Sequence, residues 1–203
     1  MVVAPGANAK LLPFDIEQVK NLSDAEIILM QLEIPMETIN AVSKIAKLNH
    51  QKVIINPAPA QTLSDELLEG LFLLTPNETE ATLLSGILVT DECTAALAAT
   101  FFLSKGVQNI IITLGKKGAY FQNDKLKLMV PAPIVMALDT TGAGDTFSGA
   151  IAVAILENIN RESIVSVCSG WETVMKFAIE TASLSVTKLG AQTSIPFRTE
   201  IIL

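Results

Sequence analysis

Short apolar runs alternate with predicted helices through the first half of the chain. Four runs have the length and composition of buried strands: residues 25–31, 52–56, 71–75 and 109–114. Four segments are predicted to be helices, and the first of them repeats its apolar residues at helical spacing: residues 35–48, 64–70, 76–86 and 91–105. This alternation predicts an α/β domain with a mainly parallel sheet.

The pattern changes after residue 114. Residues 118–131 are typical of a β-hairpin that turns at Asn123 and Asp124, and residues 144–189 are predicted to be mostly helical. Residues 1–13 resemble the end of a strand followed by a loop of Pro, Gly and Asn, so we expect the domain to begin upstream of Met1. No repeat or low-complexity segment divides the chain, which favours one domain.

Composition and charge exclude several classes of protein. Half of the 203 residues are hydrophobic and 17% are charged, which is enough for a substantial core. The net charge of −7 argues against binding to nucleic acid. Two cysteines, Cys93 and Cys168, and one histidine, His50, argue against a disulfide framework, a zinc site and a histidine-based triad. The small number of cysteines fits a cytoplasmic protein, or also a nuclear one in a eukaryote. No apolar run is long enough for a membrane span and no signal peptide is visible.

Residues that could take part in binding or catalysis follow each of the predicted parallel strands. They are Glu33, Asn56, the pair Asn77 and Glu80, and the segment 113–118. The carboxyl ends of parallel strands meet at one edge of a sheet, where ligands bind in such folds. Taken singly, each of these residues is a weak signal, because an acid at a strand end is more often a helix cap or a solvated side chain. Their shared edge favours a binding site.

The stretch ALDTTGAGDTFSGA, residues 137–150, places small residues directly before a predicted helix. Gly142, Ala143 and Gly144 leave the backbone open to a ligand, and a helix N-terminus attracts anions such as phosphate. Asp145 could then accept a proton from a hydroxyl group that attacks the phosphorus atom. The alternative is that Asp145 only caps the helix and that the glycines only form a turn.

The same stretch resembles the C-terminal signature of the PfkB family of carbohydrate kinases. Further motifs match this ribokinase-like family in order along nearly the whole chain: PGANAKL, MQLE, NPAPA, TPNETEA, ITLGKKG and KLGAQTSIP. The resemblance implies a three-layer α/β/α domain with a mainly parallel sheet, of which residues 1–203 form the C-terminal portion. It also implies that the first strands, the small β-sheet lid and a glycine-rich sugar-binding motif belong to an N-terminal segment that this chain lacks.

The activity that the resemblance implies is ATP-dependent phosphorylation of the C5 hydroxyl of D-ribose. Asp145 would be the general base, Gly142, Ala143 and Gly144 would form the anion hole, and Glu33 would bind the sugar. The partners would be ribose and ATP, with no nucleic acid or membrane, and the full-length form would be a homodimer. The alternatives are another PfkB-family sugar or nucleoside kinase, and a non-catalytic fragment that binds nucleotide.

The resemblance assigns roles to three further groups of residues. Asn77 and Glu80 would organise Mg²⁺ and phosphate. The nucleotide would be lined by Thr113, Leu114, Gly115, Lys116, Lys117, Gly118, Gly144 and Ile179. A monovalent cation, K⁺, would be held by Asp139, Thr141, Ser185, Lys188, Gly190 and Ser194, largely through backbone carbonyls.

Two features depart from the family pattern. Ile179 stands where the family often has Asn or His against the nucleotide base. Residues 163–175 form a longer segment than usual, and we expect its Trp171 and Cys168 to serve packing. His50, which ends a predicted helix beside polar residues, is expected to be a solvated surface residue.

Overall fold

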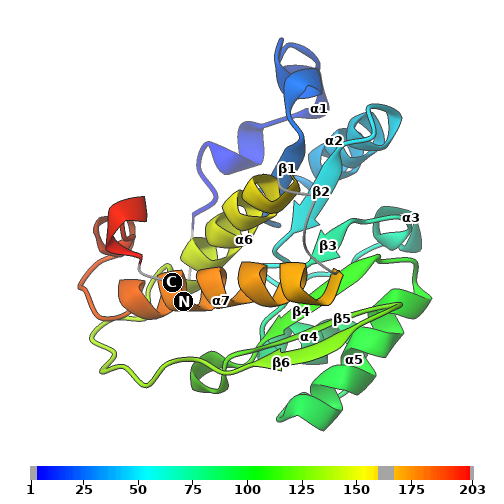
Figure 1. The fold of residues 1–203 in the computed structure, drawn as a ribbon. Coiled ribbons are helices and arrows are strands. Elements are labelled where there is room, and N and C mark those ends of the chain that lie inside the picture. The colour runs from blue at the N-terminus through cyan, green and yellow to red at the C-terminus, as the bar shows by residue number, and fades with distance from the viewer. Residues whose placement is uncertain (1–3, 160–166, 202–203) are drawn as a thin grey trace.

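A computed structural model describes residues 4–159 and 167–201 of the chain (Figure 1). In these residues one sheet has the strand order β1-β2-β3-β4-β5-β6. Its strands are β1 (Ile27–Met30), β2 (Lys52–Ile55), β3 (Leu73–Leu74), β4 (Asn109–Thr113), β5 (Ala119–Asn123) and β6 (Lys127–Val130). The first four are parallel, and β5 and β6 are antiparallel, as the hairpin pattern predicted.

In the described ranges one helix precedes β1, four lie between the parallel strands and two follow the hairpin. They are α1 (Pro13–Glu17), α2 (Met36–Leu48), α3 (Asp65–Leu68), α4 (Glu78–Ser85), α5 (Glu92–Ser104), α6 (Ala143–Ile159) and α7 (Val167–Ser185). Short 3₁₀ turns are η1 (Asn8–Lys10), η2 (Leu22–Asp24), η3 (Gly115–Lys117), η4 (Gln192–Ser194) and η5 (Arg198–Glu200). No helix in the described ranges is both long and apolar enough to cross a membrane.

The sheet has a hydrophobic core on each of its faces. Along β4, Ile110 and Ile112 pack with α2, α4 and α5 on one face, whereas Ile111 packs with α6 and α7 on the other. This alternation follows from the strand geometry, in which successive side chains point to opposite faces. Figure 1 shows α6 and α7 together on one side of the sheet. The predicted three-layer α/β/α fold with a mainly parallel sheet is therefore confirmed.

The predicted elements agree with the structure except at some of their ends. The run 71–75 contributes only Leu73–Leu74 to the sheet, and the predicted helix 64–70 is only Asp65–Leu68. Ser64 is the N-cap of that helix, and its hydroxyl accepts the backbone N–H of Leu67 at 3.2 Å. The strand end predicted at the start of the chain falls on residues 1–3, outside the described ranges.

Trp171 packs against the sheet, as we expected from its position. Its ring stacks on Phe121 with ring centroids 4.3 Å apart and lies 6.4 Å from the ring of Phe72. The side chain of Cys168 belongs to the part of α7 that is not described, so the same expectation for it stays a prediction. His50 is exposed, as predicted.

We predict that Trp171→Ala lowers the free energy of unfolding by about 2–4 kcal/mol, because it removes stacked aromatic contacts between α7 and the sheet. The matched control is Leu48→Ala, since Leu48 is 81% exposed at the end of α2. Denaturant titration followed by far-ultraviolet circular dichroism measures both. Equal losses in the two variants would contradict a packing role for Trp171.

Candidate functional site

The carboxyl ends of β1 to β4 lie along one edge of the sheet. Their pairing places Met30 beside Ile55, Ile55 beside Leu74, and Leu74 beside Ile110. Beyond these ends, Asn77 forms a bridge with Thr113, whose backbone N–H donates to the carbonyl of Pro76 at 3.0 Å. The strand register therefore brings the polar segments that follow these strands to the same edge.

The N-terminus of α6 begins with a sharp turn at Gly142. Its φ of 76° is in the left-handed region, which glycine adopts readily. The backbone N–H and the hydroxyl of Thr146 both donate to the carbonyl of Gly142, at 2.8 and 2.9 Å. The N–H of Ala143 donates to the carbonyl of Thr140 at 3.2 Å, so this predicted anion-hole donor is engaged in a turn. At Gly144 a Cβ atom would meet nothing within 4 Å, so a ligand can approach the backbone there.

Asp139 joins this turn to the segment that follows α7. Its Oδ1 accepts the backbone N–H of Thr141 at 2.9 Å, and its Oδ2 accepts that of Gly190 at 3.0 Å. Hydrogen bonds from the side chain and backbone of Thr141, and from the backbone of Gly190, lower the pKa of the Asp139 carboxyl. The carboxylate is therefore the favoured form, and it holds two distant segments together.

The other candidate cation ligands lie in or near the same segment. The carbonyl of Ser185 accepts the backbone N–H of Lys188 at 3.1 Å, and the buried Ser194 donates its hydroxyl to the carbonyl of Ala191 at 2.7 Å. The ammonium of Lys188 is 2.7 Å from Glu200, so that side chain faces the C-terminal turn. No cluster of three or more His, Cys, Asp and Glu that could hold a metal occurs in residues 4–159 and 167–201.

A pocket of about 480 Å³ lies between the 113–118 segment, the loop 132–140 that follows β6, the N-terminal part of α6 and α7. Its walls include the apolar side chains of Ile134, Val135, Phe147 and Ile179. It brings together most of the residues predicted to line a nucleotide: Thr113, Gly115, Lys116, Gly118, Gly144 and Ile179. Ala143 lines it as well, so the predicted anion hole opens into this pocket.

The turn of residues 114–118 is shaped by its second glycine. Gly118 has a φ of 109°, and a Cβ atom there would collide with the carbonyl oxygen of Val130. The N–H of Leu114 donates to the carbonyl of Gly118 at 2.8 Å, which closes the turn. The side chain of Leu114 is buried and does not line the pocket.

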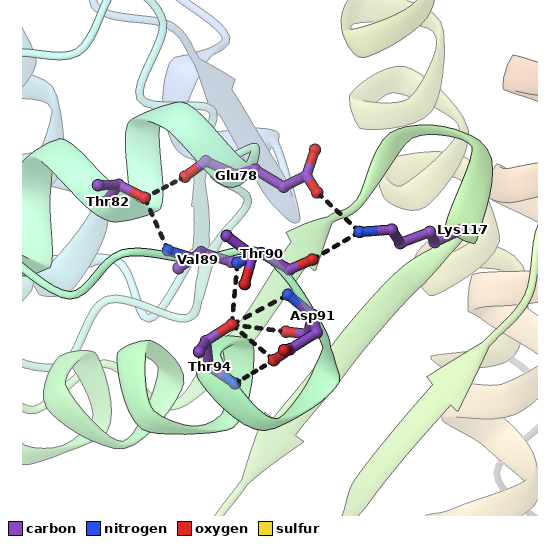
Figure 2. Close-up of polar contacts among 7 residues, drawn as sticks. All are labelled: Glu78, Thr82, Val89, Thr90, Asp91, Thr94 and Lys117. Carbon is purple, nitrogen blue, oxygen red and sulfur yellow. Dashed lines mark hydrogen bonds and ion pairs between the residues drawn. The ribbon is translucent and has the colours of Figure 1, made fainter.

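Lys117 points away from the pocket. Its ammonium donates to the carbonyl of Thr90 at 2.5 Å and lies 3.8 Å from the carboxylate of Glu78 (Figure 2). Both contacts lie on the α4–α5 side of the turn. The structure thus separates Lys117 from Lys116, which does line the pocket.

Asn77 and Glu80 form a reciprocal cap at the start of α4. The N–H of Glu80 donates to Oδ1 of Asn77 at 2.8 Å, and the N–H of Asn77 donates to Oε2 of Glu80 at 2.9 Å. Burial raises the pKa of the Glu80 carboxyl, although hydrogen bonds with the backbone and side chain of Asn77 oppose this shift. Oε1 of Glu80 takes no part in the cap.

The contact between Gln31 and Asp145 was not predicted from the sequence. Nε2 of Gln31, just after β1, donates to Oδ1 of Asp145 at 2.5 Å. Nearby, Nδ2 of Asn8 donates to Oε2 of Glu33 at 3.3 Å. One sequence feature could have indicated Gln31 as a site residue: it ends a predicted strand, on the same edge of the sheet as the other candidates.

Residues 1–198 match the pfkB family of carbohydrate kinases. The chain belongs to this family. The predicted family is therefore confirmed, and the match covers every described element up to the C-terminal 3₁₀ turn.

Several named relatives of this chain are ribokinases, and others are named deoxyribokinase. Ribokinase from Haemophilus influenzae is 41% identical over 203 residues, which are 100% of this chain and 63% of that protein. The solved ribokinase from Thermotoga maritima is 41% identical, with a TM-score of 0.81 over 98% of this chain and 63% of that one. Ribokinase from Arabidopsis thaliana complexed with ribose and ATP is 31% identical, with a TM-score of 0.85 over 98% of this chain and 62% of that one. The chain thus spans less than two thirds of these relatives.

We predict that Asp139→Asn destabilises the chain near neutral pH, because the amide has one acceptor oxygen where the carboxylate has two. The lowered pKa means that ionised Asp139 contributes stability above the ordinary aspartate range, and that this contribution disappears as the pH falls through the lowered value. The difference between parent and variant should therefore shrink on acidification. Urea midpoints at about pH 7 and about pH 3 measure it.

The matched control is Asp124→Asn, at an exposed acid in the β5–β6 turn. It should change the urea midpoint little at either pH. A difference between parent and Asp139→Asn that stays constant with pH would contradict the assigned role of the carboxylate.

Proposed function

We propose that this chain carries the nucleotide and phosphate side of a sugar kinase that transfers the γ-phosphoryl group of ATP to the C5 hydroxyl of D-ribose. The observation that carries the proposal is the position of the pocket. Ala143 and Gly144, at the N-terminus of α6, line the same pocket as the 113–118 segment, and Asp145 follows directly. A pocket for the nucleotide base, a helix N-terminus that can bind an anion and the candidate general base Asp145 are therefore contiguous.

We assign the adenine base of ATP and the ribose attached to it to the apolar part of the pocket. Its volume of about 480 Å³ is within the range of small-molecule sites. Ile134, Val135 and Ile179 offer apolar contacts, and the glycines of the 113–118 segment let the ligand approach the backbone. Lys116 lines the same pocket and supplies a positive charge toward the phosphates.

The transferred phosphoryl group belongs at the start of α6. The helix dipole favours negative charge there, and Gly144 leaves space for it. Phosphoryl transfer depends mainly on positioning and charge stabilisation. The sugar hydroxyl oxygen forms a bond to the γ-phosphorus while the bond from that phosphorus to the bridging oxygen breaks, which releases ADP.

Asp145 accepts the proton of the attacking hydroxyl. Gln31 already donates to Oδ1, so Oδ2 is the oxygen that we assign to the proton. Glu33, held by Asn8, would accept hydrogen bonds from other hydroxyls of the sugar. Glu33 follows β1, and Asp145 lies in the first turn of α6, where Gln31 joins it to the same end of β1.

Two cations fit the proposed site. Oε1 of Glu80, outside the capping pair, and the neighbouring Asn77 offer oxygen ligands that suit Mg²⁺, directly or through water. Asp139 with backbone carbonyls around Thr141, Ser185, Lys188, Gly190 and Ser194 offers an oxygen-rich set for K⁺. When bound, Mg²⁺ would neutralise phosphate charge, and K⁺ would stabilise the turn that leads into α6.

The choice of ribose rests on the likeness to ribokinases, one of which was solved with ribose and ATP. We extend the same likeness to a cytoplasmic location and to a homodimer in the full-length form. Another sugar or nucleoside as the acceptor is the competing proposal, and a coupled assay with ribose, deoxyribose and adenosine distinguishes these acceptors.

We predict that Asp145→Asn lowers the rate of ribose phosphorylation by the full-length form about 10²–10⁴-fold, because a positioned general base contributes that much. The Kd for ATP should stay within about twofold, since the base acts on the other substrate. A coupled assay for ADP measures the rate, and isothermal titration calorimetry measures the Kd. Asp124→Asn serves as the control for an unrelated loss of carboxylate.

Undiminished turnover in Asp145→Asn would contradict the assigned base. ATP binding by the parent chain without any phosphorylated sugar would support the competing interpretation, a non-catalytic nucleotide-binding fragment. No ATP binding at all would contradict the proposed function.

Replacing K⁺ with tetramethylammonium at equal ionic strength should weaken ATP binding and slow the reaction. The bulky cation cannot enter a set of carbonyl ligands, so the turn before α6 would lose its support. Calorimetric titrations in the two salts measure this effect, and Na⁺ serves as a small-cation comparison. Identical Kd values and rates in all three salts would remove the proposed K⁺ site.

A further inference from the structure

The ammonium of Lys117 contacts protein groups that lie outside the pocket. It donates to the carbonyl of Thr90 at 2.5 Å and forms an ion pair with Glu78 at 3.8 Å (Figure 2). The lysine side chain is half-exposed. Since exposed ion pairs contribute little, the hydrogen bond to the carbonyl is the stronger of the two contacts.

The carbonyl that Lys117 contacts belongs to a segment that is fixed on both sides. The N–H of Thr90 donates to the hydroxyl of Thr94 at 2.9 Å, in the first turn of α5. The N–H of Val89 donates to the hydroxyl of Thr82 at 3.0 Å, and that hydroxyl donates to the carbonyl of Glu78 at 2.8 Å. Figure 2 shows these contacts joining α4 and α5 around the Lys117 ammonium.

The 114–118 turn is short and lines the pocket through Gly115, Lys116 and Gly118. Within the turn, the N–H of Lys117 donates to the carbonyl of Leu114 at 3.1 Å. The side chain of Lys117 therefore connects the pocket wall to α4, which has Asn77 as its N-cap and Glu80 in its first turn.

We propose that Lys117 is a positioning residue that holds the 114–118 turn against the α4–α5 segment, so that the turn is ordered before a nucleotide binds. This inference rests on the proposed function and revises the role implied by the family resemblance, in which Lys117 lines the nucleotide. A turn that is already ordered lowers the conformational entropy lost on binding. The ammonium itself does not contact the phosphates.

The test uses Lys117→Met, which keeps the aliphatic stem and removes the ammonium. We expect its Kd for ATP to rise roughly threefold to tenfold, because ordering the turn then opposes binding. The Kd for adenosine should rise by the same factor, since the turn lines the pocket for both ligands. The Lys117→Arg variant should keep most of the parent's affinity for ATP and adenosine, because its guanidinium can donate to the same carbonyl.

Lys105→Met is the matched control, since Lys105 pairs with Asp65 at 3.0 Å outside the pocket. It should leave both Kd values unchanged. A rise in Kd for ATP but not for adenosine would show that Lys117 contacts phosphate directly, and would overturn the inference. Unchanged Kd values in Lys117→Met would overturn it as well.

Amide hydrogen exchange in the nucleotide-free chain provides a readout that does not depend on ATP binding. We expect faster exchange for the amides of the 114–118 turn in Lys117→Met, and parent-like exchange in Lys117→Arg and Lys105→Met. Equal exchange in the parent and Lys117→Met would overturn the inference. Absence of ATP binding by the parent would overturn the proposed function alone, and the exchange rates would still decide the role of Lys117.

Discussion

The carboxylate of Asp139 fixes the start of α6. One oxygen accepts the N–H of Thr141 just before the helix, and the other accepts the N–H of Gly190 beyond α7. These two hydrogen bonds join segments separated by 51 positions along the chain. The turn at Gly142, the open backbone at Gly144 and one wall of the pocket all follow from where this helix begins.

A second contact, between Gln31 and Asp145, joins the start of α6 to the segment just after β1. Two contacts thus hold the proposed reaction centre, one from that segment and one from the segment after α7. Both contacts position the helix start, which agrees with a reaction that depends mainly on positioning and charge. Charge and geometry also explain why small residues precede α6, since larger side chains would fill the space that an anion needs.

The alternation of strands and helices and the hairpin were predicted because they depend on local patterns of apolar residues and turn residues. The three layers and the roles of most candidate residues came instead from the resemblance to the family, and those roles stay predictions. The Gln31–Asp145 contact spans 114 positions and depends on packing, so no local pattern indicates it. Asn77 and Glu80 illustrate a different limit, because the same spacing serves both a capping box and the family motif. For Lys117, the sequence located the turn but not the direction of its side chain.

The most direct test of the proposed site is an amide-resolved NMR titration of the chain with ATP and Mg²⁺. We expect the amides of Ala143, Gly144 and the 113–118 segment to shift together with one Kd. The residues around a second pocket, lined by Thr62, Asp65 and Lys105, should not respond. Shifts confined to that second pocket, or no change at Ala143 and Gly144, would contradict a nucleotide and phosphate site at the start of α6.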